Sequence, residues 1–318
     1  MTRPLKVAAF IAALAALYLA WQWWGPGPLA KPLTVTIREG STRGSAARDL
    51  EVAGAVGGRS WYYFGRIIGS NDPIQAGEFE IPAHASGSAI LDLLQHGRPV
   101  QRLITVTEGM PAIIVAEKLA ANSFLTGSVP DIREGSLLPD SYSFERGERR
   151  SQIVARMQSA MTKVLAALWP KRSNDCPVAT PEQAIIMASI VEKETGKSSE
   201  RPMIAGVYCN RLRIGMKLDA DPTVIYPVTK GKPLGRRILR SELAADNGYN
   251  TYRRAGLPDG PIANPGRDSI AAVLHPATTK ALYFVADGSG GHAFAETLAE
   301  HQRNVDHWFK LRRSKGEM

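Results

Sequence analysis

The chain has 318 residues, of which 44% are hydrophobic and 22% charged, and its formal net charge is +9. This balance is ordinary for globular protein, and the length gives room for two domains and a sizeable core. The charge suits an anionic partner such as membrane lipid, cell-wall polymer or nucleic acid, although solubility and a basic end at 310–315 also account for it. No RNP motif or clustered basic-aromatic face occurs, which argues against nucleic acid.

A membrane-spanning helix is predicted at 7–24, an apolar run close to the ~20 residues that a span needs. Positive charge in the preceding residues 1–6 favours a cytoplasmic N-terminal tail. The alternative is a cleaved signal peptide, but no clean cleavage site follows, and bulky residues stand where small ones are needed. The run ends in an aromatic belt of Trp21, Trp23 and Trp24. A Gly- and Pro-rich linker at 25–32 comes next.

A small α/β module is predicted at 33–102. Alternating apolar and β-branched residues indicate its strands, and helical periodicity indicates the segments between and after them. The expected elements are a strand at 33–37, helices at 45–51 and 61–68, a strand at 76–81 and a helix at 89–96.

A larger mixed α+β unit is predicted at 103–318, so the fold class of the whole chain is α+β. Segments read as loops are 135–142, the Asp-Pro segment after Leu218 and the Pro/Gly stretch at 256–266. The expected elements are a strand at 102–106, helices at 111–121, 150–168 and 268–274, a strand at 282–286 and a closing helix at 298–310 that faces solvent on one side.

Cysteine and histidine patterns predict neither a metal site nor a cofactor. The six histidines lack metal-ligand spacing, and neither H-E-x-x-H nor C-x-x-C occurs. The two cysteines, Cys176 and Cys209, are too few for a disulfide framework. Cys209 lies in an apolar helical segment and is expected to be a buried thiol; a bridge to Cys176 is the alternative in an oxidising compartment.

The segment after Thr180 carries the chemistry. Thr180-Pro181-Glu182-Gln183 predicts a helix start with Thr180 as N-cap and Gln183 closing a capping box. At helical spacing Glu194 falls on the apolar face of Met187, Ile190 and Val191, whereas Glu192 points roughly the opposite way. A desolvated carboxyl holds its proton near neutral pH, as a general acid for glycosidic cleavage must. The alternative is a solvated helix end.

Long motifs extend this pattern in a fixed order: AGEFEIP with LLQHG, LPDSYSF, IVEKET, SSER, YCNRLRIGMKLDADPTVIY, YNTYRRAGLPDGPIANPGRDSIAAVLHP and LYFVADGSGGHAF. Through them the chain, from about Leu33 to Asn304, resembles the YceG/MltG-like lytic transglycosylases, which are membrane-anchored endolytic murein enzymes. The family's catalytic glutamate, the second Glu of its E-K-E motif, falls on Glu194.

The resemblance implies a LysM-like module at 33–102, which would bind N-acetylglucosamine polymers unless it is only a spacer, and a catalytic domain at 103–318. It implies a lyase that cuts the MurNAc–GlcNAc bond of peptidoglycan strands, leaves 1,6-anhydro ends and ends strand growth beside peptidoglycan synthases. The enzyme would sit in the inner membrane by one span, with the catalytic domain in the periplasm.

Candidate substrate contacts follow Glu194 along the chain. Aromatic faces and amides are common in sugar sites, which points to the turn at 249–252, and the family motif supplies the remaining candidates. The full set is Asn210, Arg211, Asp221, Thr223, Tyr226, Tyr249, Asn250, Thr251 and Tyr252. Arg211 is expected to be held away from Glu194, since a nearby cation would lower the pKa of that carboxyl.

Two alternatives remain open at this point. In a glycoside hydrolase, Asp221 or Asp219 would activate water beside Glu194; in a non-catalytic wall-binding scaffold, Glu194 would be dispensable. Two departures from the family pattern leave substrate preference open: Asp219 replaces an amide, and Asp259 replaces the second Pro of a Gly-Leu-Pro-Pro-Gly loop.

Overall fold

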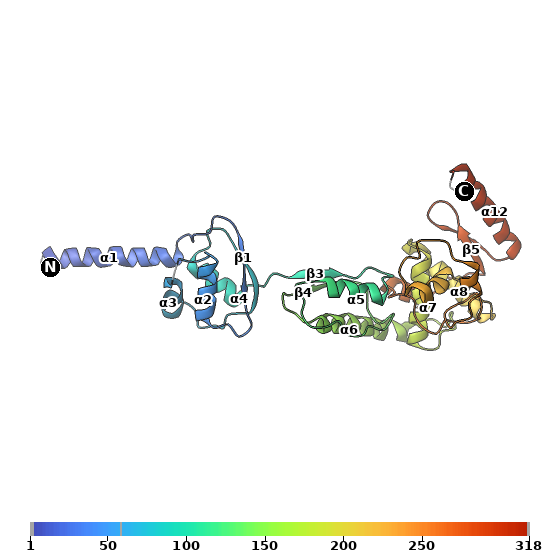
Figure 1. The fold of residues 1–318 in the computed structure, drawn as a ribbon, viewed down its shortest axis with the longest axis horizontal. Helices are drawn as coiled ribbons and strands as arrows, with labels where there is room; N and C mark the ends of the chain where they lie inside the picture. The colour runs from blue at the N-terminus through green and yellow to red at the C-terminus, as the bar shows by residue number, and fades with distance from the viewer. Residues whose placement is uncertain (1–2, 58, 317–318) are drawn as a thin grey trace. The chain divides into compact units, whose positions relative to one another are not determined.

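The computed structural model of the chain describes residues 3–57 and 59–316 and is a mixed α+β protein, as predicted. The polypeptide divides into two compact units. The first comprises Met1–Arg102 with Ser143–Gly147, and the second comprises Leu103–Tyr142 with Glu148–Met318 (Figure 1).

The first unit begins with helix α1, Arg3–Trp24, which starts inside the segment expected to be a tail. Its part Val7–Trp24 is long and apolar enough to cross a membrane. Trp23 is only 3% exposed and packs against Phe64, whereas the other two tryptophans of the predicted belt are exposed. Trp23 is therefore a core residue of the first unit.

A two-stranded antiparallel sheet forms the centre of this unit, with Leu33 of β1 opposite Ile81 of β2. The inward side chains at Val35, Ile37 and Phe79 are buried, which explains the alternating sequence pattern. The predicted order of strand, two helices, strand and helix is confirmed. The elements are β1 (Leu33–Ile37), α2 (Arg43–Val52), α3 (Ser60–Ile67), β2 (Gly77–Ile81) and α4 (Gly87–His96).

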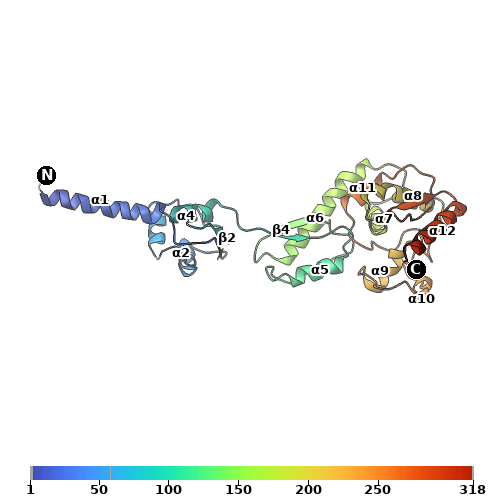
Figure 2. The same cartoon turned by 90° about the horizontal axis from the view of Figure 1, so that it is seen from above.

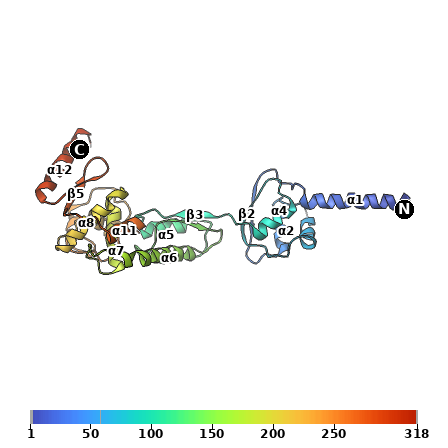
Figure 3. The same cartoon turned by 180° about the vertical axis from the view of Figure 1, so that it is seen from behind.

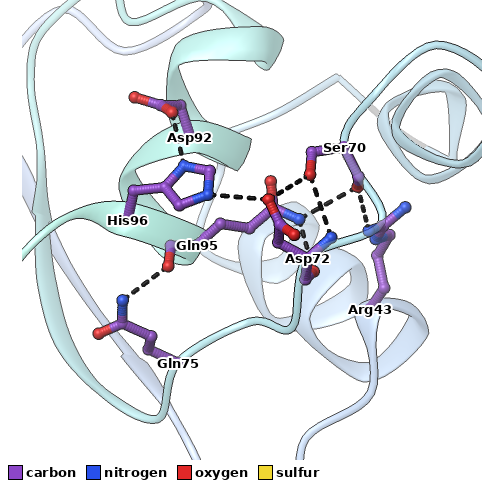
Figure 4. Close-up of polar contacts among 7 residues, drawn as sticks. All are labelled: Arg43, Ser70, Asp72, Gln75, Asp92, Gln95 and His96. Atoms are coloured by element: carbon purple, nitrogen blue, oxygen red, sulfur yellow. Dashed lines mark hydrogen bonds and ion pairs between the residues drawn. The ribbon is translucent and has the colours of Figure 1, made fainter.

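Polar contacts fasten the loop after α3 onto α4 (Figure 4). The buried Gln95 donates from Nε2 to the carbonyls of Ser70 and Asp72, at 3.1 and 2.6 Å. Beside it, the exposed His96 ring lies 2.8 Å from Asp92 and 3.0 Å from the Asp72 carboxylate. A loop without regular structure thus has its backbone carbonyls satisfied by a helix.

The second unit contains one further two-stranded sheet, most of another and most of the helices. Strands β4 and β6 and the helices α9 and α10 were not predicted. The elements are β3 (Arg102–Thr105), α5 (Ala112–Ala121), β4 (Ser141–Phe144), α6 (Arg150–Leu168), α7 (Pro181–Glu194), α8 (Arg201–Arg213), α9 (Asp221–Thr229), α10 (Arg240–Ala244), α11 (Arg267–Leu274), β5 (Tyr283–Ala286), β6 (His292–Ala295) and α12 (Leu298–Ser314), with single 3-10 turns at Trp169–Lys171 and Ser198–Glu200.

The Asp-Pro segment is a helix start rather than a loop. Helix α9 begins at Asp221, and Pro222 stands in its first turn, where the missing N–H costs no hydrogen bond. A proline in a sequence therefore marks a boundary without saying on which side the helix lies.

Helices α7, α8 and α11 pack on one another and form the core of the second unit (Figure 2). A disulfide joins α8 to the segment before α7: Cys176 and Cys209 are bonded, with their Cα atoms 4.8 Å apart. The expected free thiol at Cys209 is therefore wrong. Only the folded chain brings together two cysteines that are 33 residues apart in sequence.

The β5–β6 hairpin and α12 pack together as one substructure, here called the hairpin–helix wall (Figures 1 and 3). In the hairpin Tyr283 lies opposite Ala295. Helix α8 holds the irregular segment that leads into the wall: Asn210 Nδ2 donates to the carbonyls of Thr279 and Ala281 at 2.8 and 3.1 Å. The wall is thus fixed beside the end of α7.

Candidate active site

Helix α7 fixes the position of Glu194 because both of its ends are well defined. The Thr180 side chain accepts from Gln183 N at 3.2 Å, as predicted, but the Gln183 side chain accepts from Ala179 N at 2.7 Å, so only half of the expected capping box forms. The helix ends at Glu194, and the following Thr195 is extended. Glu194 therefore stands at the carbonyl end of the helix, where the macrodipole disfavours negative charge.

The Glu194 carboxyl is desolvated. Its Oε1 atom is buried and has no hydrogen-bond partner among the described residues. Burial raises the pKa of Glu194 to about 7, and the Asp221 carboxylate adds to this rise, while the Tyr208 hydroxyl and the Arg211 guanidinium oppose it. At neutral pH a large fraction of Glu194 therefore carries a proton.

Glu194 lines a pocket of about 400 Å³ between the core helices and the hairpin–helix wall. A cavity of this size lies within the range of small-ligand sites. The pocket also contains Tyr208, Arg211, Leu218, Asp219, Asp221, Tyr252, Tyr283, Phe284, Leu298 and His301.

Two carboxylates accompany Glu194 in this pocket, and their surroundings differ. Tyr252 donates its hydroxyl to Asp221 Oδ1 at 2.7 Å. Asp219 adopts a left-handed backbone with φ of 49°, a conformation that Asp tolerates better than most residues. Burial raises the pKa of Asp219, and Arg211, 3.8 Å away, partly offsets this.

Arg211 is closer to Glu194 than expected, but its guanidinium is occupied. It donates from Nε to Leu282 O and from Nη1 to Leu218 O, both at 2.6 Å. Burial outweighs its effect on Glu194, so the pKa of that carboxyl stays raised despite the cation. Tyr208 is 1% exposed, and burial keeps its pKa well above the ordinary value, so its hydroxyl remains a donor.

Of the predicted substrate contacts, the structure brings Arg211, Asp221 and Tyr252 into the pocket with Glu194. The side chains of Thr223 and Thr251 are buried and lie 2.8 Å apart. The buried Asn250 binds three carbonyls at the end of α10. Thr223 and Thr251 thus join α9 to the turn at 249–252, and Asn250 joins that turn to the end of α10. Asn210 also has a structural contact, because it holds the segment before the wall.

Tyr226 and Tyr249 also lie outside the Glu194 pocket. Their rings pack against each other with centroids 4.9 Å apart. Tyr226 bonds to Glu134, another carboxyl whose pKa burial raises to about 7; Glu134 also accepts from Ala112 N at 2.9 Å. Because this carboxyl caps the start of α5, its burial has a structural explanation.

Glu192 is neither a second acid nor a solvated residue. Its side chain is 4% exposed, accepts from Arg201 Nη2 at 2.8 Å and from Gly266 N at 2.9 Å, and so is fully engaged. Glu108 also accepts from Arg201 Nη2, at 2.6 Å. The ion pair ties the end of α7 to the start of α8 and to the loop before α11.

Local sequence patterns did not predict Tyr208 or the pocket residues that the wall contributes, Tyr283, Phe284, Leu298 and His301. Tyr208 lies in the apolar helical segment that also contains Cys209, and its pattern shows no more than a core position, although a tyrosine there also brings a hydroxyl. The amphipathic pattern of the closing helix did not indicate that it reaches the site. Its pocket residues are far from Glu194 in sequence and come near it only in the folded chain.

The site is a polar pocket on an α+β domain, and it contains the Glu194 carboxyl, whose pKa burial raises to about 7. The model of the YceG-like family matches residues 35–307, and the chain belongs to this family.

Two curated relatives share the name endolytic murein transglycosylase. The Bacillus subtilis protein is 34% identical over 182 residues, 57% of this chain and 49% of its own. The Streptococcus pneumoniae protein is 29% identical over 327 aligned residues, 86% of this chain and 58% of its own. The chain thus spans about half to three fifths of the length of these relatives. The crystal structure of a yceG-like protein from Listeria monocytogenes superposes with a TM-score of 0.52 at 25% identity, covering 86% of this chain and 98% of that one.

Proposed function

We propose that the protein is a peptidoglycan lytic transglycosylase with Glu194 as its acid and base. The observation that carries the proposal is the buried, unpartnered Oε1 of Glu194, with its raised pKa, in a pocket lined by polar and aromatic side chains. The names of the two curated relatives support this reaction class.

In the proposed reaction, protonated Glu194 donates to the oxygen that bridges N-acetylmuramic acid and N-acetylglucosamine, and the bond from that oxygen to the muramoyl C1 breaks. The C6 hydroxyl of the same muramoyl sugar attacks C1 and gives its proton back to the Glu194 carboxylate. The product is a 1,6-anhydro end, and no water is consumed. One carboxyl suffices because it is acid first and base second.

The pocket gives one specific reason to keep hydrolysis as a second candidate. Asp219 and Asp221 line the same pocket as Glu194, and a carboxylate across from the acid is what an inverting hydrolase uses to activate water. The Tyr252 hydroxyl already occupies one oxygen of Asp221, which favours the transglycosylase.

Mass spectrometry of murein digested by the detergent-solubilised chain tests the proposal. We expect 1,6-anhydro ends from the parent and none from Glu194→Gln. Reducing ends without anhydro ends would establish the hydrolase. A Glu194→Gln chain that folds and cuts like the parent would contradict both and leave a scaffold role.

Helix α1 supports the proposed location, a single span of the inner membrane with the N-terminus in the cytoplasm and the second unit in the periplasm. There the enzyme would cut new strands internally beside peptidoglycan synthases and end their growth. An alkaline phosphatase fused to the C-terminus should be active in cells; an inactive, folded fusion would reverse the orientation. For the first unit we propose LysM-like binding of glycan, which loss of murein binding on deleting 33–102 would support and unchanged binding would contradict.

A further inference from the structure

His301 is a pocket residue that takes no part in the proposed reaction. It lies in the first turns of α12 and reaches the pocket that contains Glu194. Among the residues that the structure describes, no other histidine lines this pocket. The wall thus contributes a side chain that can both donate and accept hydrogen bonds.

A stacking contact holds the imidazole in place. It stacks on Tyr283, with ring centroids 5.2 Å apart and planes inclined by 20°. Its Nδ1 atom is buried and finds no protein partner within the described ranges. Leaving a buried nitrogen unpaired is destabilising, so such an atom calls for an explanation.

The ring is also neutral under ordinary conditions. Burial lowers the pKa of His301, and the nearby Arg211 lowers it further. Of the two nitrogens in a neutral ring, one donates and the other accepts. A sugar hydroxyl, which does both, matches such a ring better than a carboxylate or an ammonium group would.

From this geometry we propose that His301 is a substrate-contacting residue, whose unpartnered nitrogen hydrogen-bonds a hydroxyl or amide of the glycan bound beside Glu194. The inference rests on the proposed function and adds a residue from the hairpin–helix wall to its site. The wall then closes one side of the pocket and also orients the sugar against the acid on α7.

Three variants of the full chain in detergent separate binding from folding. His301→Phe keeps a ring to stack on Tyr283 but has no nitrogen, and His301→Asn keeps a polar group near the Nδ1 position. His307→Phe is the matched control, on the same helix and exposed. Each is made in the parent, for murein cleavage, and in Glu194→Gln, for binding of purified peptide-free murein glycan strands.

We expect His301→Phe to lower both kcat/KM and glycan affinity about tenfold, the effect of one lost hydrogen bond, with the melting temperature unchanged. His301→Asn should recover part of both, and His307→Phe should match the parent. Affinity and kcat/KM within twofold of the parent for both His301 variants would overturn the inference, as would losses in both that only follow a fall in melting temperature. A parent that leaves murein uncut would instead contradict the proposed function, while the binding measurement would still test His301.

Discussion

The two sides of the last turn of α7 carry the same functional group in opposite circumstances. Glu192 faces Arg201 and a backbone N–H, and both of its oxygens are engaged. Glu194, two residues later, has a buried oxygen without a partner and a raised pKa. A buried carboxylate with partners on both oxygens holds neighbouring segments together, whereas one with an unpartnered oxygen is free to exchange a proton.

The strongest test of this contrast replaces the carboxyl of each residue in turn with an isosteric amide. Glu194→Gln should lower murein cleavage about 1000-fold or more, because the loss of a general acid commonly costs 10²–10⁴-fold in rate. Glu192→Gln, assayed where it is folded, should keep activity within about tenfold. The measurement is the rate at which anhydro ends appear. Equal losses in the two variants would show that the two sides do not differ in function.

The two variants should rank the other way in stability, with Glu192→Gln losing more than Glu194→Gln. Glu192→Gln removes the buried charge partner of the Arg201 guanidinium and leaves it the more exposed Glu108 and Asp268, and breaking a buried pair costs up to about 3–5 kcal/mol. Urea unfolding of the second unit should show this loss, with Glu182→Gln in the first turn of the same helix as a control that changes little. An unchanged urea midpoint for Glu192→Gln would mean that Glu108 and Asp268 alone neutralise Arg201.

Titration distinguishes the two carboxyls as well. The pKa of Glu194 is raised in the folded chain to about 7, above its ordinary value of 4.5, so the folded state binds this proton more tightly than the unfolded state. The parent therefore loses stability as pH rises from about 4.5 to 7, and cleavage declines above about pH 7. We expect Glu194→Gln to be about 1–3 kcal/mol more stable than the parent at pH 8 and equal to it near pH 4.

Unfolding curves of the parent and Glu194→Gln at a series of pH values provide this comparison. Glu182→Gln, whose carboxyl is exposed, is again the control. A difference between parent and Glu194→Gln that does not change with pH would show that Glu194 is solvated.

Local periodicity was enough to predict part of the site. Spacing along α7 placed Glu194 on the face of Met187, Ile190 and Val191, and the structure puts all three of these in the core while Glu194 faces the pocket. Alternation likewise gave the strands of the first unit. These signals are short-range, so they survive in the sequence of a single chain.

The remaining site residues depend on contacts that periodicity does not encode. Asn210 was expected to touch substrate, yet its amide lies on carbonyls some 70 residues away in sequence. A polar side chain looks the same in a sequence whether it binds a ligand or a distant backbone. For the same reason the Cys176–Cys209 bond was left as the alternative to a free thiol, and His301 was not predicted to line the pocket of Glu194.

The smallest expected effect concerns the exposed ion pairs of His96, in contrast to the buried pair of Glu192 and Arg201. His96 lies between Asp72 and Asp92, and the hydrogen bonds that its ring donates to these carboxylates, chiefly to Asp92, raise its pKa. The support that His96 gives to the loop at 68–76 is therefore complete below about pH 6.5 and fades as pH rises through the raised pKa. Because the group is exposed, solvent screens the interaction and the effect stays local.

Hydrogen exchange of peptides covering 68–76, followed by mass spectrometry in the parent and in His96→Asn, measures this local effect. At pH 5.5 the variant should exchange faster than the parent, and at pH 8.5 the two should coincide; comparison at equal pH cancels the intrinsic pH dependence of exchange. His275→Asn in the second unit is the control. The Gln95 amide holds the same loop at every pH, so an undiminished difference at pH 8.5 would mean that His96 acts by packing, and no difference at pH 5.5 would mean that Gln95 suffices.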